Sequence, residues 1–195
     1  FYRHFPDMEL HLSPEVFNGV WDALADGRVD VAIGATQAIP VGGRFAFRNM
    51  GMLNWRCVVK ADHPLAQHRE KVSEEAIREW PSLVLEDTSR ALPKRTTWTL
   101  DNQRRLVAPD WESAFDCLLA GLCVGMVPGH LAQPLLQNGS LCELRLDPPF
   151  PDSPCCVSWS EQQASPALRW LLDYLGETET LNSEWLREAL KTGGG

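Results

Sequence analysis

Three short polar segments, each directly after an apolar run, carry side chains suited to holding a small ligand. The segments are Ala35-Thr36-Gln37, Asp87-Thr88-Ser89-Arg90 and Asp110-Trp111-Glu112-Ser113. Hydroxyl and guanidinium groups bind oxygen acceptors, and a guanidinium or an indole also stacks on a flat ring. The local alternative is capping and turn chemistry, in which Asp110 and Ser113 satisfy the first amides of a helix. Spacing alone leaves both interpretations open.

A fourth and weaker candidate is His130, which follows the apolar run 122–127. The chain has none of the common catalytic or phosphate-binding motifs G-x-S-x-G, G-x-x-x-x-G-K-[ST], G-x-G-x-x-G or H-E-x-x-H. His63 and His68 are five residues apart across Pro64, a spacing that does not place them on one helix face. We therefore predict no catalytic residues, no metal and no cofactor.

Five basic residues crowd one stretch of an otherwise acidic chain: Arg90, Lys94, Arg95, Arg104 and Arg105. The only acid between them is Asp101. A pair of strands with one solvated face explains this pattern and is the preferred interpretation. An anionic ligand or an acidic partner surface is the alternative.

Composition excludes several classes of protein. The 195 residues carry 18 Lys and Arg against 26 Asp and Glu, a net charge of −8, and 44% are hydrophobic. That hydrophobic content favours a folded chain over a disordered one. The acidic balance argues against this segment gripping nucleic acid by itself. Its apolar runs are shorter than the roughly 20 residues that cross a bilayer.

The six cysteines include no C-x-x-C pair, and four lie in apolar, strand-like surroundings. We interpret them as reduced core thiols, which predicts a cytoplasmic protein.

Helical and strand patterns alternate along the chain. Expected strands are 8–12, 29–34, 55–60, 82–85, two within 94–108, 122–127, 141–146 and 155–159, with an irregular one in 39–48. Expected helices begin at Ser13-Pro14, Ser73, Asp110, Pro128, Ser165-Pro166 and Asn182. The pattern predicts two α/β subdomains joined by more than one crossing strand, with a ligand cleft beyond the carboxyl ends of the strands.

Four motifs in register resemble one family. They are Phe5-Pro6-Asp7-Met8-Glu9-Leu10, then residues 27–34, 61–66 and 120–128. Together they resemble the effector-binding domain of LysR-type transcriptional regulators over nearly the whole chain. Residues 17–22, 86–90 and 94–95 further resemble the enterobacterial branch that regulates purine transport and allantoin utilisation.

This resemblance implies a type 2 periplasmic-binding-protein-like fold. Subdomain I would be 1–62 plus 154–190, subdomain II 63–153, and 191–195 a tail or cloning remnant. Thr36 would face the cleft from subdomain I. Subdomain II would contribute Thr88, Ser89, Arg90, Trp111, Glu112, Ser113 and His130. The family's winged helix-turn-helix, its linker helix, and the first strand and most of the first helix of the effector domain would be absent.

The function implied is ligand sensing in the cytoplasm. A small metabolite, a purine, nucleoside or purine-degradation product, would bind in the cleft and alter subunit packing in a homodimer or tetramer. Promoter DNA would be bound only through the absent domain, with RNA polymerase as a further partner and no membrane. A solute-binding protein of the same fold and an α/β enzyme are the alternatives.

Overall fold

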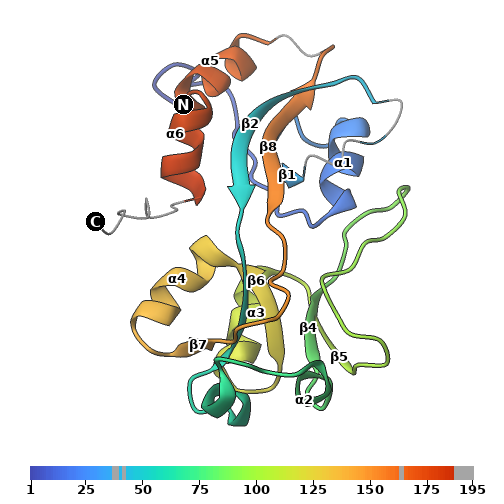
Figure 1. Ribbon diagram of the computed structural model, residues 1–195. Helices are drawn as coiled ribbons and strands as arrows, with labels where there is room; N and C mark the ends of the chain where they lie inside the picture. The colour runs from blue at the N-terminus through green and yellow to red at the C-terminus, as the bar shows by residue number, and fades with distance from the viewer. Residues whose placement is uncertain (37–39, 41–42, 163–164, 187–195) are drawn as a thin grey trace. The chain divides into compact units, whose positions relative to one another are not determined.

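The computed structural model describes residues 1–36, 40, 43–162 and 165–186. Its chain forms two compact units (Figure 1). Unit 1 comprises Phe1–Met52, Thr88–Pro93 and Pro154–Gly195, and unit 2 comprises Leu53–Asp87 and Lys94–Ser153. The chain therefore passes from one unit to the other four times, after Met52, Asp87, Pro93 and Ser153.

Unit 1 is built on a sheet of three strands in the order β1-β8-β2. The strands are β1 (Val31–Thr36), β2 (Phe45–Leu53) and β8 (Ser153–Ser160), and β1 runs antiparallel to β8. The helices are α1 (Asn18–Ala25), α5 (Pro166–Leu175) and α6 (Thr178–Leu181), which continues into the π-helical turn η2 (Asn182–Leu186). Trp21 and Leu24 of α1 pack on the sheet at Ala32, Ala35 and Cys156.

Unit 2 is built on a five-stranded sheet in the order β5-β4-β6-β3-β7. The strands are β3 (Trp55–Lys60), β4 (Ser82–Leu85), β5 (Arg105–Ala108), β6 (Val124–Pro128) and β7 (Leu141–Glu143). The helices are η1 (Pro64–His68), α2 (Glu74–Arg78), α3 (Trp111–Leu119) and α4 (Gly129–Gln137). Strand β4 is parallel to β5 and β6, whereas β3 is antiparallel to β6 and β7.

Several predicted helix starts are confirmed by their caps. The side chains of Ser73, Asp110 and Ser165 each accept a hydrogen bond from a backbone N–H in the first turn, at α2, α3 and α5. The α1 helix ends before Gly27, whose positive φ of 69° suits glycine. The end of the last expected helix, 187–190, and the tail 191–195 lie outside the described residues, as do 39 and 41–42 of the irregular strand.

Two predictions near the start of the chain are wrong. Residues 8–12 form no strand and are exposed, because no described strand pairs with them. The first helix begins at Asn18 rather than after Ser13. The Val16 N–H donates to Thr88 Oγ1 at 3.0 Å, and the Thr88 N–H donates to the Val16 carbonyl at 3.4 Å. These bonds hold the backbone before Asn18 in a non-helical conformation.

Three further expectations differ from the structure. The strand expected over 29–34 lies two residues later, as β1 from Val31 to Thr36. Of the two strands expected in 94–108, only β5 forms. Strand β3, expected in subdomain I, belongs to unit 2 because it pairs with β6 and β7.

All six cysteines are free thiols, and four of them are buried. Burial raises the pKa of Cys57 and Cys123 to about 12, and that of Cys155 and Cys156 to about 11. These thiols therefore stay protonated and inert at neutral pH. The longest helix among the described residues has ten residues, and none combines the length and apolarity needed to span a bilayer.

A buried histidine lies in the core of unit 2. His63 is 4% exposed, its Nδ1 accepts the Leu65 N–H at 3.2 Å, and its ring packs edge-on against Trp80 with centroids 4.2 Å apart. Nε2 has no partner among the described residues. Burial lowers the pKa of His63, against a smaller opposing effect of the Asp62 charge. The native state therefore favours the neutral ring.

We expect this histidine to make stability fall with acidification. The unfolded chain takes up a proton near the ordinary pKa of 6.5, and the folded chain only below that value. The free energy of unfolding should decrease as the pH falls through 6.5 and level off below the pKa of the folded state. Urea unfolding between about pH 7.5 and 5.5 measures this slope. His63→Gln should flatten it, while the exposed control His68→Gln should not; equal slopes in all three proteins would contradict the assignment.

Close approach of the Thr88 segment to α1 depends on Gly19. A Cβ at this position would overlap the Thr88 hydroxyl and press on its backbone. We expect Gly19→Ala to lower the free energy of unfolding by about 1–3 kcal/mol, as overpacking does. Ala25→Ser, at an exposed position of the same helix, is the control and should be near neutral. Equal Tm values for the two variants would show that the contact is dispensable.

Candidate functional site

Half of the predicted site residues lie in unit 1. Thr36 is half-buried at the end of β1, where it pairs with Cys155 of β8. Thr88, Ser89 and Arg90 belong to a segment, Thr88–Pro93, that leaves β4 and is held on unit 1. We expected these three residues in the second subdomain. The structure differs because the backbone of the segment bonds to α1 and the residues before it.

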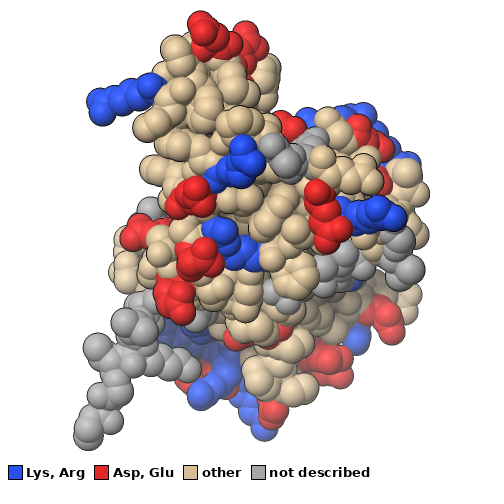
Figure 2. Space-filling model, turned by 90° about the horizontal axis from the view of Figure 1, so that it is seen from above, with Lys and Arg blue, Asp and Glu red and all other residues tan. Residues whose placement is uncertain are grey.

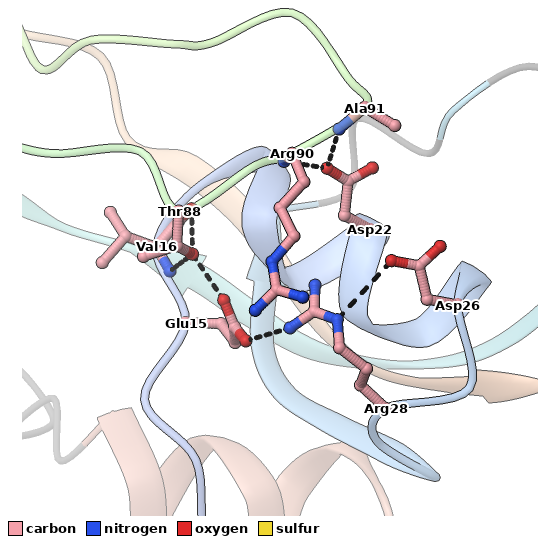
Figure 3. Close-up of polar contacts among 8 residues, drawn as sticks. All are labelled: Glu15, Val16, Asp22, Asp26, Arg28, Thr88, Arg90 and Ala91. Atoms are coloured by element: carbon pink, nitrogen blue, oxygen red, sulfur yellow. Dashed lines mark hydrogen bonds and ion pairs between the residues drawn. The ribbon is translucent and has the colours of Figure 1, made fainter.

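The anchor of this segment is Asp22, in the middle of α1 (Figure 3). Its carboxylate accepts the backbone N–H groups of Arg90 at 2.5 Å, Ala91 at 2.9 Å and Leu92 at 3.3 Å. Asp22 is only 3% exposed. Burial acts to raise its pKa, but the three backbone hydrogen bonds and the nearby Arg28 charge together hold that pKa below its ordinary value. The carboxylate is therefore ionised at neutral pH.

Thr88 forms the first end of the anchored segment. Its hydroxyl donates to Glu15 Oε2 at 2.5 Å and accepts the Val16 N–H at 3.0 Å. Glu15 is in turn paired with Arg28, whose Nη1 lies 2.7 Å from Glu15 Oε1 (Figure 3). The Thr88 hydroxyl thus has a structural role in unit 1. The sequence did not reveal this, because Glu15 and Thr88 are 73 residues apart.

The two residues after Thr88 differ in exposure. Ser89 is 6% exposed, whereas Arg90 is exposed. The Arg90 backbone N–H is bound by Asp22, but its guanidinium forms no ion pair or hydrogen bond within the described part of the chain. This side chain is chemically suited to a carboxylate, a carbonyl or a flat ring.

The remaining candidates lie at one edge of the sheet of unit 2. Strands β4, β5 and β6 are parallel, so their carboxyl ends share this edge. Trp111, Glu112 and Ser113 open α3 after β5, and His130 follows β6 in the first turn of α4. Because the strands are parallel, the polar segments that follow β5 and β6 lie at the same edge of the sheet.

The start of α3 combines capping with an available aromatic side chain. Asp110 Oδ1 accepts the Ser113 N–H at 2.8 Å, a bond that lowers the pKa of Asp110. The local capping interpretation is therefore correct for this pair. Trp111 is half-buried, with its ring centroid 6.3 Å from those of Trp55 and Phe115. Glu112 is exposed.

Two residues at the same edge were missed in the sequence. Because β3 is antiparallel to β6, Trp55 is paired with Pro128, and the start of β3 joins the edge. Asn54 accepts the Gly129 N–H at its carbonyl, 2.7 Å away, and its buried Oδ1 has no partner in the described chain. Only the strand direction brings these residues to the edge, and no sequence pattern indicates that direction.

Two of the five clustered basic residues bond to neighbours within unit 2. Lys94 Nζ lies 3.6 Å from a Glu86 carboxylate oxygen, and Arg104 donates to the Glu79 carbonyl at 2.7 Å. Figure 2 shows acidic and basic side chains mixed over the face that it presents. All five side chains are exposed, but the pair of strands in the preferred interpretation does not form, since 94–108 contains β5 alone. Among the described residues, no three His, Cys, Asp or Glu side chains are grouped as metal ligands.

Comparison with known proteins identifies the family. The family model described as "LysR substrate binding domain" matches residues 1–180. The chain belongs to this family. It is 64% identical to the HTH-type transcriptional regulator PunR of Escherichia coli K12 over 98% of its own length, and 34% identical to the HTH-type transcriptional activator AllS of Salmonella typhimurium over 80%. It spans 62% and 50% of the lengths of these proteins.

Solved structures show the same fold. The regulatory domain of CrgA, a LysR-type transcriptional regulator from Neisseria meningitidis, superposes with a TM-score of 0.63 at 19% identity, covering 92% of this chain and 87% of that one. ArgP from Mycobacterium tuberculosis gives 0.60 at 21% identity, covering 93% and 58%. The predicted fold class and family, with its enterobacterial branch, are thus confirmed.

The contacts of Thr88 predict that its hydroxyl stabilises unit 1. Thr88→Val should lower the free energy of unfolding by about 1–3 kcal/mol, because Val16 and Glu15 lose a buried hydrogen-bond partner. Thr88→Ser keeps the hydroxyl and should restore most of this loss. Chemical denaturation of the three proteins measures both effects. If Thr88→Val is as stable as the wild type, the Thr88 hydroxyl does not stabilise unit 1, and ligand contact would be its only remaining role.

Proposed function

We propose that this chain is the effector-sensing and oligomerisation part of a LysR-type DNA-binding transcriptional regulator. Its family and its 64% identity to a transcriptional regulator support the proposal. In the whole protein, promoter DNA would be bound by a separate domain, with RNA polymerase as a further partner. The subunits would form a dimer or tetramer in the cytoplasm. No bond is made or broken; ligand binding shifts the population between two arrangements of the chain.

The proposed ligand is a purine, a nucleoside or a purine-degradation product. The observation that carries this is the edge of the unit 2 sheet, where the ring centroids of Trp111 and Trp55 are 6.3 Å apart and Asn54, next to Trp55 in the chain, has a buried amide oxygen with no partner among the described residues. A flat nitrogen-rich ring offers a face for stacking on indole and N–H groups for an amide oxygen. The branch resemblance found in the sequence favours the same ligand class.

Each unit carries its own set of proposed effector contacts. Thr36, Ser89 and Arg90 would contribute from unit 1, with Thr88 placed next to them. Trp111, Glu112, Ser113 and His130 would contribute from unit 2. Asn54 and Trp55 extend this set. Arg90 is the most informative member, because its guanidinium is exposed and forms no ion pair in the described chain.

A panel of ligands tests the proposal. Thermal unfolding of the protein is recorded with nucleobases, nucleosides, ureides and keto acids, each in excess. A purine-related compound should raise Tm in proportion to its concentration over its Kd. A shift with another class and none with purine-related compounds would overturn the purine assignment. Consumption of a compound during the assay would overturn the assignment as a sensor.

Arg90→Ala should weaken binding of the best compound about tenfold, the size expected for loss of a hydrogen bond to a charged group. Its Tm without ligand should remain that of the wild type, since the guanidinium has no partner within the described residues. Lys94→Ala, an exposed neighbour paired with Glu86, is the matched control and should bind normally. Titration by isothermal calorimetry measures all three proteins. Unchanged affinity in Arg90→Ala would remove Arg90 from the site.

A further inference from the structure

A buried carboxylate on α1 is bonded to backbone that comes from a distant part of the sequence. Asp22 and Arg90 are 68 residues apart, yet the carboxylate accepts the N–H groups of three successive residues, 90–92. Leu92 is shared between the two oxygens, each at 3.3 Å. Removing a carboxylate from water costs several kcal/mol unless such donors replace the water. The three donors therefore replace the water that burial removes from Asp22.

We infer that Asp22 is the positioning residue for the Thr88–Pro93 segment and sets where the Ser89 and Arg90 side chains stand. The inference rests on the proposed function, in which these two side chains contact the ligand. Asp22 itself is buried and does not need to touch the ligand. It acts through the backbone atoms of Arg90, to which it bonds directly.

The path of the chain explains why this anchor matters. Asp87 and Lys94, on either side of the segment, belong to unit 2, while the segment between them is held on unit 1. Three contacts hold it in chain order: Thr88 on Glu15 and Val16, residues 90–92 on Asp22, and Pro93 on Asn18. Asn18 Nδ2 donates to the Pro93 carbonyl at 2.7 Å. Of these three contacts, only the one at Asp22 bonds the backbone of Arg90, whose guanidinium forms no ion pair within the described residues.

A neutral side chain replaces the carboxylate only in part. All three N–H groups reach Oδ2, and the Leu92 N–H also reaches Oδ1. An amide of the same shape has one oxygen, which can take the place of Oδ2, and one NH2 group, which would then oppose the Leu92 N–H. Asp22→Asn therefore loses the negative charge and one acceptor, and so weakens the anchor while changing almost no volume. Arg28, which lies near enough to favour the charge, remains paired with Glu15.

The experiment compares Asp22→Asn with Asp26→Asn. Asp26 lies at the exposed end of α1, and its carboxylate is 3.5 Å from Arg28 Nε. Three quantities are measured: Tm, amide hydrogen exchange of residues 90–92, and the Kd for the purine-related compound that gives the largest thermal shift. If Asp22→Asn does not fold, Asp22→Ser takes its place. Serine removes the carboxylate, and its hydroxyl can rotate so that the O–H does not face the backbone N–H groups.

We expect Asp22→Asn to exchange the amides of 90–92 at least about tenfold faster and to bind the compound about tenfold more weakly. Asp26→Asn should match the wild type in both. Faster exchange with unchanged Kd would overturn the positioning role and leave the proposed function standing. Weaker binding with unchanged exchange would overturn it as well, since the effect would not pass through the segment.

A different result separates the two proposals. If the wild-type protein binds no compound of the panel, the proposed function fails, and the positioning role fails with it. If the wild type binds and Arg90→Ala weakens binding, but Asp22→Asn does not, only the positioning role fails. A lower Tm with normal Kd in Asp22→Asn would show Asp22 to be a purely structural residue.

Discussion

The structure of unit 1 depends on one constraint, which is that buried backbone N–H groups need hydrogen-bond acceptors. The Thr88–Pro93 segment has no strand partner, so its amides are satisfied by a side chain instead, the carboxylate of Asp22. The same requirement works in reverse, because the carboxylate stays buried and ionised only with these donors around it. Gly19 allows the close approach, and Val16, bonded to Thr88, delays the start of α1. One set of bonds thus determines a helix boundary, a glycine position and the path of a candidate ligand segment.

In unit 2 the direction of the strands has the corresponding role. Parallel pairing of β4 with β5 and β6 brings Trp111 and His130 to one edge, and antiparallel β3 adds Asn54 and Trp55. These residues are held by regular elements rather than by a single anchor. Side chains on such elements lose little freedom when a ligand binds. The aromatic and amide groups of this edge are therefore held in place by the sheet, whereas the proposed role of Arg90 depends on its backbone being fixed.

Local signals in the sequence predicted much of the fold, whereas contacts between distant parts of the chain could not be predicted. Caps at Ser73, Asp110 and Ser165 were identified correctly, since a cap depends on three or four neighbouring residues. The helix start expected at Ser13 does not form, because Val16 bonds to Thr88, which is 72 residues away in the sequence. This bond holds the backbone there in a non-helical conformation. Residues 8–12 alternate as a strand should but have no described partner to pair with. Periodicity indicates which conformation a segment favours, and pairing decides whether it forms.

The same distinction applies to the candidate site. Hydroxyl, guanidinium and indole groups after apolar runs could be found in the sequence, because residue type and position are local. Whether such a group is available to a ligand could not be predicted from the sequence, since that depends on which other residues the group bonds to in the fold. Thr88 and Arg90 are two residues apart, yet one hydroxyl is bonded to Glu15 and Val16, while the guanidinium is exposed. A polar side chain already satisfied within the fold contributes mainly stability. In the proposed function, ligand selectivity would therefore depend on the groups that the fold leaves available, and Arg90 is the charged one that the Thr88–Pro93 segment supplies.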